Sequence, residues 1–214
     1  METPSITLIV HTKNAGATLE QCLASAADLV DEILVVDQGS EDNTLKIAKK
    51  FRASVLTAPD VGYADPARQM ALDTAKSDWI LVLDADEELG PEAQKNLIVL
   101  VQQPQADAYA FPRKNMIFGE WAQVGWWPDY QTRLFRKGAV NWPPELHGVP
   151  QVTGTKLELP AEENWAIIHH NYAKIDAFID RAQRYSTIAA QEMKDGKRDA
   201  KLHLVEAFGE ELLK

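Results

Sequence analysis

The chain has little cysteine and no long apolar segment, and each shortage excludes a class of protein. Cys22 is the only cysteine among 214 residues, so no internal disulfide can form, and no Cys/His spacing of the zinc type surrounds it. The longest uninterrupted apolar runs, residues 79–83 and 97–101, have five residues each. That is far below the roughly 20 residues that span a bilayer. The sequence therefore predicts no membrane-spanning helix, with Cys22 as a filler on a helix face.

Positive charge is also scarce, with 22 Lys and Arg against 32 Asp and Glu and a net charge of −10. This balance argues against a protein whose main task is to coat nucleic acid. No basic stretch precedes the first strand-like segment, so the N-terminus lacks the layout of a secretory signal. We expect a cytoplasmic protein that binds no nucleic acid. Residues 174–214 hold 8 basic and 8 acidic residues, and this neutral tail is free to approach the inner face of the membrane.

Short apolar segments alternate with segments of helical periodicity in the first half of the chain. Its length favours one large domain. Strands are expected at residues 5–10, 32–36, 54–57 and 79–83. Helices are expected at residues 18–30, 43–51, 65–76 and 91–102, the first opened by a capping box at Thr18 and the third capped by Asp65. The alternation predicts an α/β fold with a central, mostly parallel sheet flanked by helices.

The second half has a different character. Strands are expected at residues 107–112, 132–135 and 165–169, and residues 118–130 read as a loop that holds three tryptophans. From residue 175 onward the pattern is helical. We therefore expect one domain over residues 1–173, in two halves that meet near residue 103, and a C-terminal helical segment, residues 174–214, packed on it.

Polar clusters follow three of the predicted strands, at residues 11–14, 37–40 and 84–88. Parallel strands bring their carboxyl ends to one edge of a sheet, where α/β proteins bind ligands. Asp84 and Asp86 are separated by one small residue, which lets their oxygens face a hard divalent cation that also holds phosphate. An aspartate at a strand end can instead only cap a turn. The agreement of three clusters favours a metal–diphosphate site.

Two further side chains belong to this edge in the same interpretation. Asp37 is either a turn residue that hydrogen-bonds its own backbone or an acceptor for a nucleobase N–H. Arg68, in the first turn of the third helix, is either a surface charge or a phosphate contact.

These residues carry a resemblance to a known family. Residues 33–44, ILVVDQGSEDNT, resemble the VVD-x-GS-x-D-x-T segment of family 2 glycosyltransferases, and residues 79–87, WILVLDADE, resemble their strand and DxD motif. The spacing of the two, with Arg68 between them, also matches. Residues 118–136 resemble the WxPD-x-x-x-RLF segment of a narrower branch, the bacterial lipopolysaccharide core glucosyltransferases. The resemblance implies the GT-A (nucleotide-diphospho-sugar transferase) fold, with residues 1–103 as the nucleotide-binding half and residues 104–173 as the acceptor half.

The resemblance also implies site residues. For the nucleotide and donor sugar they are Thr12, Asn14, Asp37, Gly39, Ser40, Arg68 and Asp84. Asp84 and Asp86 would hold a divalent cation, Mn²⁺ or Mg²⁺, with His147 as a third candidate ligand. Asp129 would be the catalytic base, and the acceptor would meet Trp126, Trp127 and Arg133.

We therefore expect an inverting, metal-dependent glycosyltransferase. It would move a sugar from a nucleotide-sugar donor, most readily a UDP-sugar, to a hydroxyl of a saccharide or lipid-linked glycan. A base takes the acceptor proton while a bound metal stabilises the leaving diphosphate. His169 and His170 are further candidates for chemistry.

Three positions depart from the family pattern and keep alternatives open. Residues 11–14 read HTKN where many relatives have Pro-x-Tyr-Asn, Gln69 stands where an Asn commonly follows the Arg, and Gly148 replaces the Glu of a His-Glu pair. A noncatalytic nucleotide- or sugar-binding module with the same fold therefore remains an alternative. A sugar-1-phosphate nucleotidyltransferase is a weaker one, because residues 11–18 lack its glycine-rich phosphate loop. No G-x-G-x-x-G follows the first strand, which argues against a dinucleotide-dependent oxidoreductase.

Overall fold

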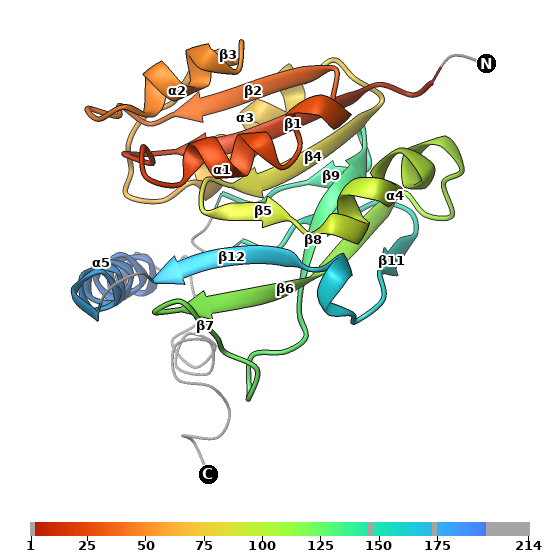
Figure 1. The fold of residues 1–214 in the computed structure, drawn as a ribbon. Helices are drawn as coiled ribbons and strands as arrows, with labels where there is room; N and C mark the ends of the chain where they lie inside the picture. The colour runs from red at the N-terminus through yellow and green to blue at the C-terminus, as the bar shows by residue number, and fades with distance from the viewer. Residues whose placement is uncertain (1–2, 145–147, 173–174, 196–214) are drawn as a thin grey trace.

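The computed structural model describes residues 3–144, 148–172 and 175–195, and these form an α/β fold around one mixed sheet (Figure 1). The strands are β1 (Ile6–Thr12), β2 (Glu32–Asp37), β3 (Ser54–Thr57), β4 (Trp79–Asp84), β5 (Glu87–Leu89), β6 (Ala108–Ile117), β7 (Glu120–Trp121), β8 (Asp129–Arg136), β9 (Val140–Asn141), β10 (Gln151–Val152), β11 (Lys156–Glu158) and β12 (Ile167–Tyr172). The helices are α1 (Leu19–Ala24), α2 (Thr44–Lys50), α3 (Asp65–Thr74), α4 (Pro91–Gln102) and α5 (Ile175–Lys194), with 3₁₀ turns η1 (Ala27–Leu29) and η2 (Glu163–Trp165).

The main sheet has the strand order β3-β2-β1-β4-β8-β6-β12-β5, and β7 and β11 pair with β6. Its first four strands are parallel, as predicted from the sequence. Beyond them the sheet is mixed, because β8 runs antiparallel to both β4 and β6. The expected α/β architecture is confirmed, and the parallel character is confined mainly to its first half.

The register of the parallel strands brings the predicted polar clusters to one edge. Thr12 lies opposite Asp37 in the β1–β2 pair, and His11 lies opposite Asp84 in the β1–β4 pair. We call this edge, made by the carboxyl ends of β1, β2 and β4, the strand-end rim. The arrowheads of β2 and β12 point toward the side of the molecule where α5 lies (Figure 1). The rim is therefore formed by backbone pairing, independently of any ligand.

Helices cover both faces of the first half of the sheet. On one face, Val10, Leu81 and Leu83 are buried in a cluster shared with α1, α2 and α4. On the other, Ile9 and Val82 are buried against α3. Each fully buried side chain of this size contributes roughly 1.5 to 3 kcal/mol. Because neighbouring residues of β1 and β4 point into opposite clusters, their near-continuous apolar sequence is explained by burial on both faces.

Several predicted boundaries are wrong. α1 ends at Ala24, and Thr18 makes no side-chain capping hydrogen bond. Asp65 is the first residue of α3 and not its cap, a position that Ala64 occupies. The predicted loop is shorter, because β8 already begins at Asp129. Cys22 is buried on α1, as expected.

α5 confirms the predicted C-terminal helix over 20 residues. A Cβ atom built on Gly62 would lie 3.1 Å from Cδ1 of Ile188, so α5 reaches back to the loop between β3 and α3. The second predicted apolar stripe, residues 202–212, lies outside the described residues. Among the described helices, none is long and apolar enough to cross a membrane.

Candidate functional site

The loops that follow β1 and β2 are joined to each other at the strand-end rim. The Lys13 ammonium donates to the Gly39 carbonyl at 2.6 Å, and the Asn14 N–H donates to the Ser40 hydroxyl at 2.9 Å. The Asn14 side-chain oxygen accepts from the Glu41 N–H at 2.8 Å. Asn14 and Gly39 have positive φ angles of 51° and 78°, which asparagine and glycine adopt more readily than other residues. The structure thus brings together three residues that the sequence assigned to the nucleotide site.

The sequence left two alternative functions for Asp37, and the hydrogen bonds of its side chain bear on one of them. Its Oδ2 accepts from the backbone N–H groups of Gly39 and Ser40 at 3.1 and 3.0 Å, so this oxygen shapes the turn. Its Oδ1 accepts from the Thr12 hydroxyl at 3.2 Å. The turn interpretation is therefore confirmed for one oxygen. The predicted contact of Asp37 and Thr12 with a nucleoside stays a prediction.

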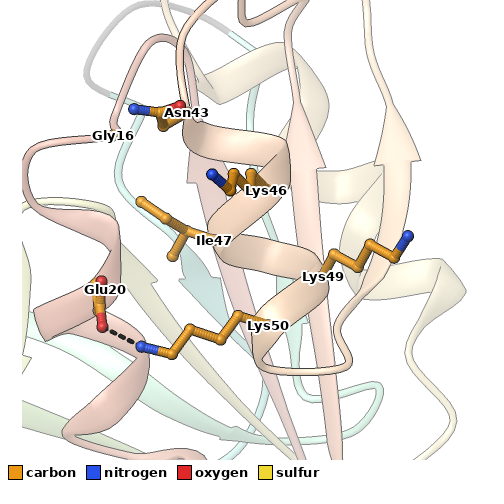
Figure 2. A pocket seen from close by; sticks show the side chains of 7 residues that line it. All are labelled: Gly16, Glu20, Asn43, Lys46, Ile47, Lys49 and Lys50. Carbon is orange, nitrogen blue, oxygen red and sulfur yellow. Dashed lines mark hydrogen bonds and ion pairs between the residues drawn. The ribbon is translucent and has the colours of Figure 1, made fainter.

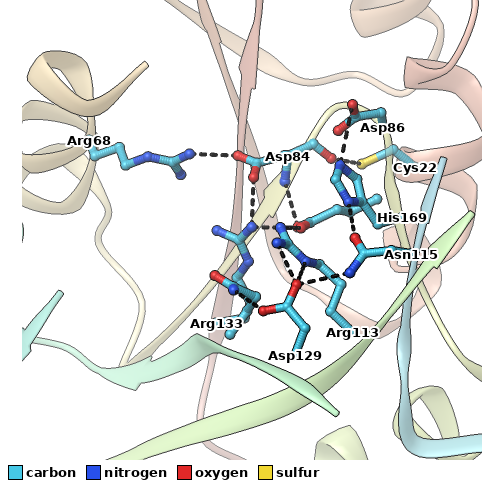
Figure 3. Close-up of polar contacts among 11 residues, drawn as sticks. Cys22, Arg68, Asp84, Asp86, Arg113, Asn115, Asp129, Arg133 and His169 are labelled. Atoms are coloured by element: carbon cyan, nitrogen blue, oxygen red, sulfur yellow. Dashed lines mark hydrogen bonds and ion pairs between the residues drawn. The ribbon is translucent and has the colours of Figure 1, made fainter. Parts of the chain in front are cut away.

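Asp84, the first aspartate of the DxD pair, is held between two arginines (Figure 3). Arg68 donates to its Oδ1 and Arg133 to its Oδ2, each at 2.6 Å. Burial opposes ionisation of the carboxyl group, but the Arg133 and Arg68 charges outweigh it and hold the pKa of Asp84 well below its usual range. Asp84 is therefore ionised, and both its oxygens already accept charge-assisted hydrogen bonds.

Glu87 extends this charge network below the rim. Its side chain is buried, and its Oε1 accepts from Arg133 at 2.6 Å and from Arg113 at 3.3 Å. Its Oε2 accepts from the Asp84 N–H at 3.0 Å. Burial opposes the cationic form of Arg133, but Asp84 and Glu87 outweigh it and raise the pKa of this arginine. The network places two carboxylates around one buried guanidinium group.

Asp129 lies at the other end of the network. Its Oδ2 accepts from Arg113 Nε and Nη2 at 2.8 and 2.6 Å and from Asn115 Nδ2 at 3.0 Å. Its Oδ1 accepts from Gln131 at 2.8 Å. Burial raises the pKa of Asp129, but Arg113, Asn115 and Gln131 together have the larger, opposite effect and lower it. The carboxylate is therefore ionised, and Oδ1 is its less engaged oxygen.

Asp86 has a different environment from Asp84. Its Oδ2 lies 3.6 Å from Nε2 of His169, and Nδ1 of the same ring lies 2.7 Å from Asn115 Oδ1. The His170 N–H donates to the Asp86 carbonyl at 2.9 Å. Strand pairing thus places Asp86 beside β12, away from the arginines that hold Asp84.

The side chains available to coordinate a metal ion suit an ion that a phosphate ligand also coordinates, and not an ion held by protein side chains alone. Among the described residues, no three His, Cys, Asp or Glu side chains are grouped so as to hold an ion by themselves. Mg²⁺ is commonly bound by one or two carboxylates, with substrate phosphates and water completing its coordination. Asp86 fits that pattern, whereas both oxygens of Asp84 face arginines. His147, the other predicted candidate, lies outside the described residues.

His11 lies beside Asp84 in the sheet register and is buried against α3. Burial, followed by the positive charge of Arg68, lowers the pKa of its imidazole to about 3. The ring is therefore neutral in the folded protein at physiological pH.

This shift predicts a pH-dependent stability. An unfolded histidine has a pKa of about 6.5, so below that pH the unfolded chain binds a proton that folded His11 does not. Stability due to this residue is complete above pH 6.5 and falls as the pH drops toward 3. Between pH 7 and pH 5 the free energy of unfolding should decrease by about 2 kcal/mol on its account. Urea unfolding at both pH values should show a smaller decrease for His11→Gln, and equal decreases would contradict the assignment.

The three residues predicted to contact the acceptor substrate differ in exposure and in their contacts. Trp126 is 45% exposed and stands at the surface. Trp127 packs edge-on against Trp121, with ring centroids 5.2 Å apart. Arg133 is 3% exposed and contacts Asp84 and Glu87. Of the three, Trp126 is the exposed side chain, whereas Arg133 is buried and hydrogen-bonds two carboxylates; contact with an acceptor stays a prediction for all three.

Gln69, which departs from the family pattern, has a structural function here. Its side-chain oxygen accepts from the Trp142 N–H at 2.8 Å, and its amide group donates to Asp73 at 2.8 Å. The Trp142 ring in turn lies 4.6 Å from the Arg68 guanidinium, a cation–π distance. Gln69 therefore helps to hold α3 and Arg68 in place.

A separate surface pocket of about 590 Å³ lies between α1 and α2 (Figure 2). Three lysines of α2 line it: Lys46, Lys49 and Lys50. Lys50 is paired with Glu20 across the pocket. It contains none of the rim carboxylates, so it is distinct from the candidate site.

Sequence reasoning missed Arg113 and Asn115, and it included Glu87 only as part of the polar cluster at residues 84–88. Arg113 and Asn115 are two positions apart on β6, so a strand places them on the same face. That alternation was a usable signal, but the predicted strand ended at residue 112.

Comparisons with known proteins agree with this fold. The family model of "Glycosyl transferase family 2" matches residues 7–151. A TPR repeat-containing protein of Synechococcus elongatus is 34% identical over 193 residues, which cover 85% of this chain and 45% of that protein. The chain therefore spans less than half of that relative's length. An uncharacterized glycosyltransferase of Rickettsia bellii is 28% identical over 213 residues, covering 94% of this chain and 72% of that protein.

Solved structures share the fold at lower identity. TarS (residues 1–349) of S. aureus has a TM-score of 0.56 at 20% identity, covering 87% of this chain and 64% of that one. Glucosyl-3-phosphoglycerate synthase of Mycobacterium tuberculosis, solved with Mn²⁺, UDP and phosphoglyceric acid, has a TM-score of 0.56 at 16% identity, covering 92% and 80%. These likenesses support the GT-A architecture inferred from the sequence.

Proposed function

Because the chain belongs to glycosyl transferase family 2, we propose that its strand-end rim binds a nucleotide-sugar and transfers the sugar to an acceptor hydroxyl. The observation that carries this proposal is the register that aligns Thr12 with Asp37 and His11 with Asp84. It brings Thr12 and Asp37, the residues proposed to contact the nucleoside, to the same edge as Asp84, the first aspartate of the DxD pair. Such edges are where open α/β sheets bind ligands.

We propose UDP as the nucleotide. Two structures with the same fold, TarS and glucosyl-3-phosphoglycerate synthase, were solved with UDP, and the second also with Mn²⁺. In this chain, Asp37 Oδ1 and the Thr12 hydroxyl would face the nucleoside, and Asp86 would hold the cation near the diphosphate. When bound, a divalent cation supplies positive charge that stabilises the leaving diphosphate.

The proposed reaction inverts the anomeric centre. The acceptor oxygen attacks the anomeric carbon on the face opposite the nucleotide, the bond from that carbon to the diphosphate oxygen breaks, and the diphosphate leaves with the electron pair. The acceptor proton passes to a base, for which Asp129 Oδ1 is the candidate. The side chain of Asp129 is 26% exposed, so an acceptor hydroxyl could reach it, and Trp127 two residues earlier in the sequence would be a candidate to stack on the acceptor sugar.

The acceptor that we propose is a saccharide or a lipid-linked glycan, with the lipopolysaccharide core as the first to test. This assignment rests on the resemblance of residues 118–136 and on the exposed ring of Trp126. A peripheral contact with the membrane would suit a lipid-linked acceptor.

Thermal denaturation with UDP, GDP, CMP and ADP, each with and without Mn²⁺ or Mg²⁺, tests donor binding. A ligand selective for the folded state at 100 times its Kd stabilises the fold by about 2.7 kcal/mol. We expect UDP with Mn²⁺ to raise the melting temperature most. No shift with any nucleotide would refute the proposed donor site. A shift without sugar transfer to any glycan acceptor would instead favour the noncatalytic binding module.

A further inference from the structure

We propose that Arg113 is a positioning residue for the base: it holds the carboxylate of Asp129 so that Oδ1 faces the acceptor, and Glu87 in turn fixes Arg113. This inference rests on the proposed function, because it takes Asp129 as the group that receives the acceptor proton. It assigns a function to an arginine that the sequence analysis left without one.

The guanidinium group of Arg113 is held at three nitrogens. Its Nε and Nη2 donate to Oδ2 of Asp129 at 2.8 and 2.6 Å, and its Nη1 donates to Oε1 of Glu87 at 3.3 Å (Figure 3). The side chain of Arg113 is 19% exposed. A planar group bonded in this way fixes the direction of its partner as well as the distance. The carboxylate of Asp129 is thus anchored by a group that is itself immobilised.

The two oxygens of Asp129 are consequently unequal. Within the described part of the chain, Oδ2 accepts three hydrogen bonds, two from Arg113 and one from Asn115, whereas Oδ1 accepts one, from Gln131. Each carboxylate oxygen has two lone pairs, so Oδ1 keeps the capacity to accept another proton. A general base must lie within hydrogen-bond reach of the proton that it takes. Arg113 therefore determines which oxygen of Asp129 can act.

Glu87 anchors Arg113 from the interior of the molecule. Its side chain is buried, and its Oε1 is shared between Arg113 and Arg133. Its Oε2 accepts from the Asp84 N–H at 3.0 Å. A buried carboxylate is tolerated where cations and hydrogen bonds compensate its desolvation, so Glu87 needs both arginines. Through Glu87, the ion pair that holds the base is joined to the ion pair that holds Asp84 at the strand-end rim.

The strand register brings the arginine and the base together. Arg113 lies opposite Asp129 in the antiparallel pair of β6 and β8. Side chains opposite each other in such a pair lie on the same face of the sheet and are close enough to interact. Asn115, two residues further along β6, is on that face as well. The approach of Arg113 to Asp129 is therefore set by backbone pairing.

The charge of Arg113 also affects the protonation of the base. Burial raises the pKa of Asp129, and the largest opposite influence is the charge of Arg113. The groups that face this carboxylate are Arg113 and Asn115 of β6 and Gln131 of β8, with Glu87 of β5 behind the guanidinium group. Without Arg113, burial is opposed only by uncharged hydrogen-bond donors. Its loss should therefore shift the ionisation of Asp129 to higher pH.

The next residue of the strand provides a matched control. The ammonium group of Lys114 pairs with Glu163 and lies 4.6 Å from the ring centroid of Trp121. Successive residues of a strand point to opposite faces, so Lys114 is directed away from Asp129. Lys114→Gln removes the same charge as Arg113→Gln but leaves the partners of Asp129 intact.

The first test needs no substrate and follows the titration of the Asp129 carboxyl carbon by NMR, in chains labelled at aspartate and assigned with Asp129→Asn. We expect Arg113→Gln to move this titration to higher pH and Lys114→Gln to leave it unchanged. Arg113→Lys, which keeps the charge but not the planar fork, should lie between Arg113→Gln and the wild type. The melting temperature is measured at each pH, so that an unfolded variant is recognised.

The second test follows UDP release from UDP-glucose with Mn²⁺, with water as the acceptor. Arg113→Gln should lower kcat about 10- to 100-fold, the cost of a small misplacement of a reacting group, while KM for UDP-glucose changes little. Arg113→Lys should recover part of the loss. Added to Asp129→Asn, Arg113→Gln should cause no further loss of kcat, because a positioning residue has no effect once its base is gone.

The outcomes separate this inference from the proposed function. If folded Arg113→Gln keeps either the titration of Asp129 or kcat at its wild-type value, the inference is overturned while the donor site stands. A full additional loss in the Asp129→Asn background would also overturn it, because Arg113 would then act independently of the base. If Asp129→Asn itself keeps the wild-type rate of UDP release, the assignment of the base in the proposed function fails.

Discussion

Replacing Arg133 by methionine is expected to lower the free energy of unfolding by about 3 to 5 kcal/mol, the cost of breaking a buried ion pair on one side. Arg133 is 3% exposed, and its Nη2 lies 2.6 Å from both Asp84 Oδ2 and Glu87 Oε1. Methionine fills much of the same volume but leaves two carboxylates without their shared cation. Urea unfolding at pH 7 measures the loss.

Arg136 is the matched control for this prediction. It lies on the same strand, its side chain is 49% exposed, and its Nε is 3.2 Å from Asp107. An exposed pair of this kind contributes about 0 to 1 kcal/mol, so Arg136→Met should be nearly neutral. Adding Glu87→Gln to Arg133→Met should recover part of the stability, because it removes one of the two buried carboxylate charges that Arg133 had neutralised. Equal effects of the two arginine variants would refute a buried network.

The second large effect is expected on transfer. Asp129→Asn should reduce kcat by about 10²- to 10⁴-fold, the usual contribution of a general base. An amide at this position cannot take the acceptor proton. The rate is measured at saturating donor and Mn²⁺, so that any weakening of donor or cation binding is compensated by concentration.

Two control measurements distinguish the loss of a catalytic base from a loss of cation binding. Raising the Mn²⁺ concentration should not restore the activity of Asp129→Asn. Glu120→Gln, which removes an exposed carboxylate from the adjoining hairpin, should retain wild-type kcat. If Asp129→Asn is fully rescued by Mn²⁺, Asp129 contributes to cation binding and the base is another group.

The part of the fold that the sequence predicts well is the part governed by local pattern. β3 and α4 have the expected bounds, and β1, β2 and β4 end within two residues of them, because apolar runs bounded by polar residues define strand ends. The positions of Thr12, Asp37 and Asp84 on one edge follow directly from parallel pairing. The predicted cap at Thr18 failed because cap geometry depends on backbone angles, and Thr18 has φ −122° and ψ −28°.

The part of the site that the sequence does not predict depends on pairing between distant strands. Asp129 meets Arg113 because β6 and β8 are antiparallel in a register that places them opposite each other. No local pattern encodes that register, and it determines which basic group stands beside the carboxylate. Likewise, His169 reaches Asp86 only through the pairing of β12 with β5.

The hydrogen bonds that join the two loops at the strand-end rim affect the entropy cost of binding a ligand there. Lys13, Asn14 and Ser40 are already held by contacts across the two loops before any ligand arrives. Ordering a free loop residue costs about 1 to 2 kcal/mol of backbone entropy, and here that cost is met during folding. Association with the rim should therefore be fast and show little conformational rearrangement, with affinity governed by how well the ligand fits a surface that is preorganised.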